Sequence, residues 1–419
     1  MLTETILVFM QHTKNITIVT NFYYPEDTAI GLYTTQFSNY LSNKGYSVKI
    51  ITGFPYYPTW KIFESYNNHP DFYSEKIDAI EVFRYKQFVP EKVTFGGRIK
   101  MMFSAVYGTF CNLKKINDTD LIICIVPFTM SILPAMLLAK KKKAKLWVHI
   151  QDFEFDLALE SGIVKKNNLA SKLFESSVLS FERFLLNRAT LVSSISNSML
   201  SKIREKSKHD MPYFFPNWVS SNKINPELSK KHPLINPDKF TVLYSGNIGE
   251  KQNWDFLYDL CQVISPTENI EIVIVGDGGF KNTLIEKLKS FPFVNYYEPV
   301  PYEELNDLLC SADVHFLFQK TDVLDTVMPS KILGMMASKK PSIISGNQNS
   351  EVLKVIHESQ GGFYFSENNI QPVYQTILEL KNNPALSEQM GLKARNYILE
   401  KFNAEKILAD FEQKISALI

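Results

Sequence analysis

The chain has 419 residues, of which 45% are hydrophobic and 21% charged, and its formal net charge is +1. This length exceeds what one hydrophobic core usually supports and predicts two domains, while the near-neutral charge excludes a broadly basic nucleic-acid-binding surface. The four cysteines show no CxxC motif and no metal-binding spacing, as is typical of thiols in a reducing compartment. No apolar run is long enough to cross a membrane and the first residues do not resemble a secretory leader, so we expect a cytoplasmic protein.

The first half of the chain begins with alternating strands and helices, the pattern of a parallel doubly wound sheet. A β-branched strand at 16–20 leads into a loop with Gly31, and a helix at about 32–42 is followed by a strand at 46–52. Gly31 could let a bound phosphate approach the backbone, although a turn is the commoner role of a loop glycine. The aromatic-rich stretch at 54–97 shows no regular period.

Two later segments of this half have both a core and a membrane interpretation. Residues 98–115 (RIKMMFSAVYGTFCNLKK) predict a helix that is apolar nearly all round and basic at both ends. Such a helix is either buried in a core or docks on a membrane or a lipid-linked substrate. The four lysines at 140–143 are typical of a solvated helix end but could also attract anionic lipid.

Polar residues cluster around the carboxyl end of the strand predicted at 146–150 (LWVHI). His149 lies in this strand, and Asp152, Glu154 and Asp156 follow it. Ligand-facing residues of an open α/β sheet lie at such strand ends, so these four residues form a candidate polar cluster. A histidine in a strand is, however, more often a core residue whose hydrogen bonds are satisfied.

From about residue 211 the chain is rich in Pro, Asn, Ser and Lys, which predicts a linker, and a second set of strand–loop–helix units follows. The strand at 241–244 ends in the loop SGNIGEK, and the strand at 270–275 ends in the turn GDGG, which lacks the third spaced glycine of a dinucleotide-binding fingerprint. Two such sheets facing each other would form an interdomain cleft, the usual place for a substrate.

The segment 313–344 combines a buried strand, a polar loop with Asp325, a helix start at Pro329-Ser330 with Lys331 beside it, and a further strand. A helix N-terminus with an adjacent lysine suits an anion such as a phosphate. On geometry alone, an ordinary strand–helix–strand unit with a solvated lysine is the simpler interpretation.

Several segments, in chain order, carry a family likeness: NFYYPEDTAIGLYT, LWVHIQDFEFD, FFPNWV, LYSGNIGEKQNWDFL, IVIVGDGG, VNYYEPVPYEEL and MPSKILGMMASKKP. They resemble the family-4 glycosyltransferases of the GT-B fold, closest to the WcaI-like branch of colanic-acid, capsule and O-antigen enzymes. The resemblance implies an α/β chain of two Rossmann-like doubly wound domains facing an interdomain cleft. It places an acceptor domain at 1–218, a nucleotide-sugar donor domain at 219–395, and a helix at 396–419 that can cross back to the first domain.

The resemblance also implies a reaction and its partners. A hexosyl or N-acetylhexosaminyl group would move, with retention and without a required metal or other cofactor, from a nucleotide diphosphate sugar to a hydroxyl. UDP is the favoured nucleotide and GDP the alternative. The acceptor would be a lipid-linked saccharide of a bacterial surface polysaccharide, with peripheral contact at the inner face of the plasma membrane and no nucleic acid involved.

The site residues follow from the matching motifs. The resemblance implies that the donor diphosphate is bound by Gly31, Gly246, Asn247, Lys251, Ser330 and Lys331. Lys251 matches the lysine of the family's basic pair, whereas Asn247 stands where the family has an arginine, and Lys331 could compensate. Fixed donors of this kind stabilise the charge that develops on a leaving diphosphate. The sugar would face His149, Gln151 and Asp152, so the candidate catalytic residues are His149, Asp152, Lys251 and Lys331.

The nucleoside would be bound by Gly276, Pro299 and Val300. The family's two glutamates, eight positions apart, fall on Thr326 and Gly334. The ribose contact of the second glutamate must therefore come from elsewhere, and Asp325 is the nearest carboxylate.

Two other functions would suit the same fold. A nucleotide-sugar 2-epimerase needs acid–base side chains around the sugar, of which this chain offers few. A non-catalytic nucleotide-sugar-binding protein is suggested by the missing glutamates. Epimerisation without an acceptor would identify the first, and tight binding without turnover the second.

Overall fold

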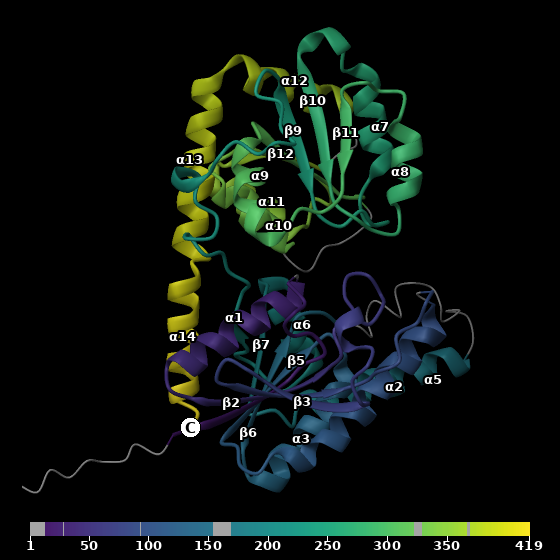
Figure 1. Cartoon of the computed structure of the whole chain (residues 1–419), viewed down its shortest axis with the longest axis vertical. Coiled ribbons are helices and arrows are strands. Elements are labelled where there is room, and N and C mark those ends of the chain that lie inside the picture. Colours follow the sequence, from purple (N-terminus) through teal and green to yellow (C-terminus); the bar gives the residue numbers. More distant parts are fainter. Residues whose placement is uncertain (1–12, 28, 93, 154–168, 322–328, 367–368) are drawn as a thin grey trace, which may run out of the picture. The chain divides into compact units, whose positions relative to one another are not determined.

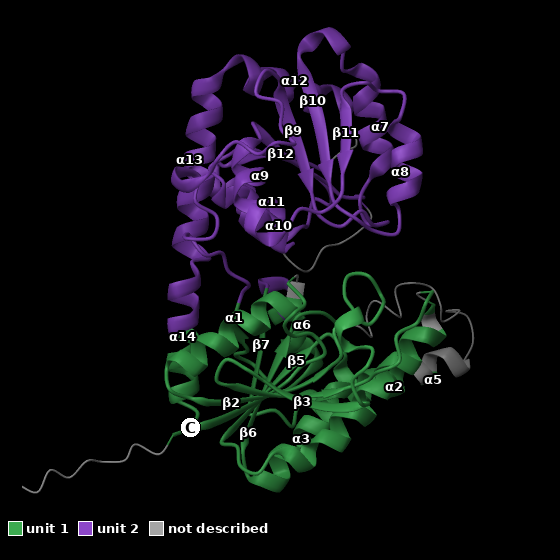
Figure 2. Ribbon diagram, viewed as in Figure 1, with its two compact units in different colours: residues 1–195, 200–215, 410–419 green, residues 196–199, 216–409 purple. Residues whose placement is uncertain are grey.

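The computed structural model describes residues 13–27, 29–92, 94–153, 169–321, 329–366 and 369–419. The chain divides into two compact units (Figure 2). Unit 1 contains residues 1–195, 200–215 and 410–419, and unit 2 contains residues 196–199 and 216–409. Unit 1 is thus built from both ends of the chain, with unit 2 inserted between them.

Unit 1 is organised around an eight-stranded sheet of order β3-β4-β2-β1-β5-β6-β7-β8, in which only the β3–β4 pair is antiparallel. The central strands are rich in β-branched residues and buried along their whole length, as expected of a sheet covered on both faces. The strands are β1 (Asn15–Val19), β2 (Ser47–Gly53), β3 (Phe72–Ile77), β4 (Ile80–Tyr85), β5 (Leu121–Val126), β6 (Lys145–Ile150), β7 (Leu191–Ser194) and β8 (Tyr213–Phe214).

Two parts of unit 1 differ from the sequence-based expectation. The stretch at 54–97 is not irregular throughout, because it contains the antiparallel pair β3–β4, whose turn places Asp78 at a φ of 52°. The linker expected from residue 211 includes β8, which completes the sheet beside β7. Strands β3 and β8 are the two edges of the sheet and β4 lies next to β3. The apolar pattern that reveals a strand is weakest at such edges.

The helices of unit 1 are α1 (Ala29–Asn43), α2 (Phe95–Asn112), α3 (Ile132–Lys142), α5 (Leu169–Leu186), most of α6 (Asn197–Lys206) and the end of α14 (Ala404–Ser416). Of these helices, α1, α2 and α3 pack on this sheet and α5 packs on α3 (Figure 1). Helix α2 packs its buried face against β2 and β4, with α3 beside it. The other face of α2 exposes aromatic rings, with Phe103 56% and Tyr107 66% exposed. The helix therefore contributes to the core on one side and presents an apolar surface on the other.

The last helix completes the core of unit 1. The Phe411 side chain on α14 is fully buried, and its ring stacks on that of Phe215 with centroids 4.3 Å apart. The Trp147 ring centroid lies 4.9 Å from it and the Phe37 centroid 5.5 Å. Residues from four distant parts of the sequence thus form one aromatic cluster.

Unit 2 contains a six-stranded, wholly parallel sheet of order β11-β10-β9-β12-β13-β14. Its strands are β9 (Phe240–Ser245), β10 (Ile270–Val275), β11 (Val294–Tyr297), β12 (Val314–Phe318), β13 (Ser342–Ser345) and β14 (Gly362–Phe365). The helices are α7 (Trp254–Val263), α8 (Lys281–Leu288), α9 (Leu305–Ser311), α10 (Ser330–Ala337), α11 (Glu351–Ser359), α12 (Ile370–Asn382) and α13 (Pro384–Lys401). The prediction of two doubly wound α/β domains is confirmed.

Candidate functional site

The strand order of unit 2 changes direction between β9 and β12. From β9 the chain adds β10 and β11 on one side, whereas β12, β13 and β14 extend the sheet on the other. The loops that follow β9 and β12 therefore leave in opposite directions, and open α/β sheets bind their ligands at such a switch point. Gly246 follows β9 here, and Lys320 lies just beyond the end of β12.

Glycines allow the loops at this edge to pack without side chains. A Cβ atom on Gly276 would lie 1.9 Å from the carbonyl oxygen of Gly246, and one on Gly278 would lie 2.3 Å from that of Ile248. Gly246 itself has a φ of 140°, which L side chains rarely adopt. Backbone groups rather than side chains therefore form this part of the surface, as required for close approach by a ligand.

Lys331 lies beside these glycines. Its ammonium donates a hydrogen bond of 3.1 Å to the Tyr244 hydroxyl and sits 4.7 Å from the centre of the Tyr244 ring. A Cβ atom on Gly246 would be only 3.1 Å from the Lys331 Nζ atom. The Tyr244 hydroxyl in turn donates to the Asn247 carbonyl oxygen at 2.6 Å. The structure therefore brings Gly246, Asn247 and Lys331 together, with Tyr244 as an anchor that the sequence analysis did not identify.

Two further lysines lie at the same edge. Lys251 is exposed in the loop before α7, and its carbonyl oxygen accepts a hydrogen bond of 3.0 Å from the backbone N–H of Lys320. Lys320, also exposed, was not identified from the sequence, because its proximity to Lys251 depends on strands β9 and β12 being neighbours. Ser330 is exposed as the first residue of α10, whose N-cap residue Pro329 makes no side-chain cap, and the N-terminal end of a helix favours an anion.

The expected nucleoside residues follow the neighbouring strands. Pro299 is exposed and Val300 half-buried just after β11, and the Tyr296 hydroxyl donates to the Gly276 carbonyl oxygen at 2.8 Å. Asp325 and Thr326 lie outside the described residues. Gly334 is inside α10, where a Cβ atom would lie 3.1 Å from the Leu309 Cδ1 atom. A glutamate at Gly334 would therefore need Leu309 to move.

In unit 1, His149 is a core residue whose ring is hydrogen-bonded to the half-buried Gln151 side chain. It is 2% exposed, and burial lowers its pKa from 6.5 to about 3, so the ring is neutral. Its Nδ1 atom pairs with the Ser193 hydroxyl at 2.9 Å, and its Nε2 atom accepts from the Gln151 amide at 2.8 Å. His149 and Gln151, two residues apart in the extended chain, share a face. The arrangement supports a role for His149 in orienting Gln151.

Asp152 is half-buried, and its Oδ1 atom accepts from the backbone N–H of Phe153 at 2.9 Å. The other two carboxylates of the expected cluster, Glu154 and Asp156, lie outside the described residues. The described acidic residue nearest to the carboxyl end of β6 along the chain is therefore Asp152.

Gly31 lies in the first turn of α1 and not in the preceding loop as expected, because α1 begins earlier than the sequence suggested. A Cβ atom on Gly31 would lie 2.5 Å from the Glu26 carbonyl oxygen and 2.9 Å from the Glu26 Cβ atom. Close packing of its own loop is thus sufficient to require glycine here. Binding of a phosphate by this backbone stays a prediction.

Glu26 holds this loop against the one that follows β2. Its carboxylate accepts backbone N–H groups from Tyr23 at 3.1 Å, Tyr56 at 3.0 Å and Tyr57 at 2.9 Å. The side chain is buried, and this burial raises its pKa from 4.5 to about 7 against the lowering effect of the three donors and Arg84. Sequence analysis did not identify Glu26, since two of its three donors, Tyr56 and Tyr57, are about thirty positions away.

The raised pKa of Glu26 predicts a pH-dependent stability. The folded state binds the proton more strongly than the unfolded state, so the contribution of Glu26 to stability falls as the pH rises from about 4.5 to about 7. We expect the stability of the wild type relative to Glu26→Gln to be about 2 kcal/mol lower at pH 8 than at pH 5. Urea unfolding of both proteins at the two pH values measures this difference, and an equal difference at both would contradict it.

Comparison with known proteins identifies the chain. A family model described as "Glycosyl transferases group 1" matches residues 225–397. The chain is also 30% identical over 407 residues to the putative colanic acid biosynthesis glycosyl transferase WcaI of Escherichia coli K12, covering 93% of this chain and 96% of that protein. The chain belongs to the group 1 glycosyltransferases. Within them it is similar to WcaI, as the sequence motifs indicated.

Solved structures of glycosyltransferases have the same fold. Sucrose-phosphate synthase from Thermosynechococcus elongatus superimposes with a TM-score of 0.70 at 15% identity, covering 97% of this chain and 99% of that one. Anabaena Alr3699/HepE in complex with UDP and glucose gives a TM-score of 0.66 at 12% identity, covering 96% and 100%. The prediction of a GT-B fold with two Rossmann-like units is confirmed.

In the part of the chain that the structure describes, no group of three or more His, Cys, Asp or Glu side chains is placed to hold a metal ion. No helix of this described part is both long enough and apolar enough to span a membrane.

Proposed function

We propose that this glycosyltransferase transfers a sugar, with retention, from a UDP-sugar to a lipid-linked saccharide during the synthesis of a bacterial surface polysaccharide. The observation that carries the proposal is the juxtaposition of Lys331, Tyr244 and the Gly246 backbone at the switch point of unit 2. The name of WcaI supports polysaccharide synthesis, and the presence of UDP in the HepE complex supports UDP as the carrier.

In the proposed reaction the bond between the anomeric carbon and the diphosphate breaks, and the acceptor hydroxyl oxygen bonds to that carbon from the same face. The acceptor proton passes to the leaving phosphate oxygen, so no separate carboxylate base is needed. Lys331, Lys251 and the first N–H groups of α10 would stabilise the negative charge that develops on the diphosphate. Because these are fixed cations and dipoles, the reaction would not require a metal ion.

A nucleotide screen tests this proposal. We expect UDP to raise the unfolding temperature more than GDP or dTDP does at the same concentration, because the nucleotide that binds most tightly stabilises the folded state most. A ligand at about 100 times its dissociation constant adds about 2.7 kcal/mol of stability. UDP-sugars should then yield free UDP only when an acceptor is present. Preference for GDP would overturn the choice of nucleotide, epimerisation without acceptor would indicate a 2-epimerase, and binding without turnover across acceptors would indicate a sensor.

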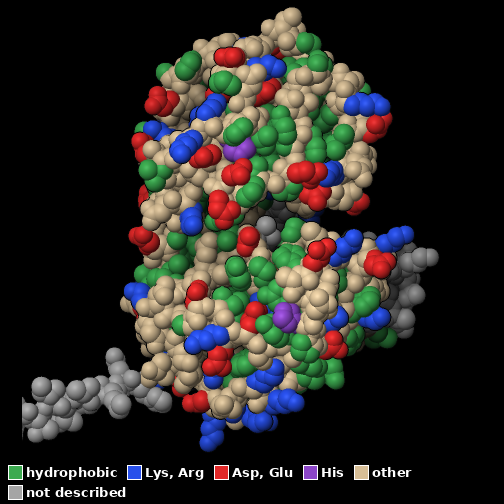
Figure 3. Space-filling view, viewed as in Figure 1, with side chains coloured by type: hydrophobic (Ala, Val, Ile, Leu, Met, Phe, Trp, Pro, Cys, Tyr) green, Lys and Arg blue, Asp and Glu red, His purple; other side chains and the backbone are tan. Residues whose placement is uncertain are grey.

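We also propose that unit 1 contacts an anionic membrane through α2 and α3. One stripe of α2 exposes Lys100, Phe103 and Tyr107, and neither helix contains an acidic residue. The adjacent α3 exposes Leu137 and ends in lysines. Lys and Arg side chains gather with hydrophobic ones at the end of unit 1 where α3 lies (Figure 3). Aromatic rings flanked by basic residues suit the headgroup region of a bilayer.

Vesicle sedimentation tests this contact. The chain should bind vesicles containing phosphatidylglycerol, and the double variant Phe103→Ser with Tyr107→Ser should bind markedly less, with unchanged stability because both rings are exposed. The matched control is Leu392→Ser, an exposed apolar residue of unit 2. Equal binding of all three proteins would refute the proposed surface.

A further inference from the structure

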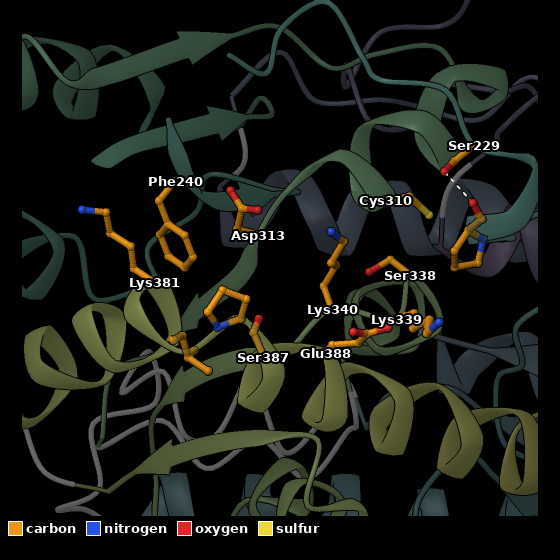
Figure 4. A pocket seen from close by; sticks show the side chains of 13 residues that line it. Ser229, Phe240, Cys310, Asp313, Ser338, Lys339, Lys340, Lys381, Ser387 and Glu388 are labelled. Carbon is orange, nitrogen blue, oxygen red and sulfur yellow. Dashed lines mark hydrogen bonds between the residues drawn. The ribbon is translucent and has the colours of Figure 1, made fainter. Parts of the chain in front are cut away.

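Unit 2 carries a second pocket at the edge of its sheet opposite to the candidate donor site (Figure 4). Phe240 is the first residue of β9, Asp313 precedes β12, and Lys340 lies just before β13, so the pocket is at the amino ends of these strands. Its volume is about 470 Å³. Nothing in the proposed glycosyl transfer uses this pocket.

Lys340 is the central cation of the pocket. Its ammonium points into the space between Asp313 and Cys310 in Figure 4, and no hydrogen bond or ion pair to another described residue holds it. Burial lowers the pKa of Lys340, and the nearby Lys231 and Lys339 lower it further, while Asp313 acts in the opposite sense. A bound anion would offset both the burial and the repulsion between these ammonium groups.

The neighbouring cations are already held by the protein. Lys231 donates to the Ser311 carbonyl oxygen at 2.9 Å, and Arg395 donates to that of Ile224 at 2.9 Å. Lys381 donates to the Glu268 carbonyl oxygen, and its ammonium points away from the pocket in Figure 4. Lys340 is therefore the cation best placed to contact a ligand directly, with the others contributing positive potential.

The rest of the lining suits a polyhydroxylated ligand. The Asp313 Oδ2 atom accepts the Thr241 N–H at 2.7 Å, which fixes the carboxylate, and Glu388 is exposed at the rim. Carboxylates accept hydrogen bonds from sugar hydroxyl groups, and an aromatic ring such as Phe240 can pack against the apolar face of a sugar. Ser229 and Ser387 also line the pocket, and the Ser229 hydroxyl donates to the Pro226 carbonyl oxygen at 2.9 Å.

We infer that this pocket is a binding site for a sugar phosphate, distinct from the site of the nucleotide-sugar donor. The phosphate group would pair with Lys340, and the hydroxyl groups would donate to Asp313 and Glu388. A ligand without the anionic group would lose the contact to Lys340, and one without the sugar would leave the two carboxylates without hydroxyl partners.

Calorimetric titration of the full chain with glucose 1-phosphate tests the inference. The matched variants are Lys340→Met and Lys331→Met, which remove the lysine of the pocket and the lysine of the donor site while keeping an apolar side chain of similar length. We expect Lys340→Met to weaken binding by about tenfold or more, since hydrogen bonds to charged groups are strong, and Lys331→Met to leave it unchanged. Inorganic phosphate should bind more weakly than glucose 1-phosphate.

Each other outcome would overturn the inference. Loss of binding in Lys331→Met alone would place the sugar phosphate in the donor site, and equal binding by all three proteins would place it elsewhere. No binding by the wild type would exclude the ligand class, and equally tight binding of inorganic phosphate would exclude the contacts to the sugar. Thermal unfolding of both variants establishes that a loss of binding does not come from a loss of structure.

Discussion

Replacing Lys331 by methionine should lower the rate of sugar transfer by about 100-fold to 1,000-fold while leaving the fold intact. The lysine is half-buried beside the Gly246 backbone, and its ammonium is oriented by the Tyr244 hydroxyl. A fixed cation in this position stabilises the diphosphate most when its charge is greatest, in the transition state. The effect should therefore appear mainly in kcat, with a smaller change in KM for the donor.

Two further variants serve as a control for Lys331→Met and as a test of how Lys331 is oriented. Lys289→Met removes a lysine whose side chain is 65% exposed and which lies between the end of α8 and the start of β11, at the opposite edge of the sheet from the candidate site, and its activity should match the wild type. Tyr244→Phe keeps the ring but removes the hydroxyl that orients Lys331, so an intermediate loss is expected. Wild-type kcat in Lys331→Met, measured by UDP release at saturating donor, would remove this lysine from the proposed mechanism.

Replacing Phe411 by alanine should destabilise unit 1 by about 3–5 kcal/mol, the usual cost of removing a fully buried phenylalanine ring. Phe411 has no exposed surface, and its neighbours Phe215, Trp147 and Phe37 come from separate elements that cannot all move to fill the cavity. A domain is stable by only about 5–15 kcal/mol, so this single change would remove a large share of the stability of unit 1.

The control for Phe411 is another phenylalanine of the same unit. Phe214 is 38% exposed, and Phe214→Ala should change stability by less than about 1 kcal/mol. Because the chain has two units, chemical unfolding should be followed with probes that separate their transitions. Only the transition of unit 1 should move in Phe411→Ala. A shift no larger than that of Phe214→Ala would mean that α14 is dispensable for this core.

Sequence patterns predicted the fold class because some central strands are nearly continuous runs of apolar, mostly β-branched residues. The run LIICIV of β5 and the run IEIVIV of β10 are buried along their whole length and could be assigned without knowledge of their partners. The pair β3–β4 and the short strand β8 were missed, since their burial is uneven and their pairing is set by neighbours in the sheet.

The residues of the candidate site likewise fall into those that sequence motifs predict and those that only the folded sheet brings together. Gly246 and Lys331 could be named from motifs, whereas Tyr244 and Lys320 acquire their places only because β9 and β12 are adjacent in the sheet. The environment of His149 depends on Ser193, which is 44 residues further along the chain. No local pattern could therefore show that burial keeps this histidine neutral.

The course of α14 has a consequence for how the protein is made. A ribosome completes unit 2, which ends at residue 409, before Phe411 emerges, and until then the rings of Phe37, Trp147 and Phe215 lack this partner. During synthesis, unit 1 would thus persist as a partly formed domain with exposed aromatic surface, while unit 2 has all of its residues available once residue 409 has been made. Closing so long a loop is slow, and nascent chains halted before α14 should depend on chaperones to stay in solution.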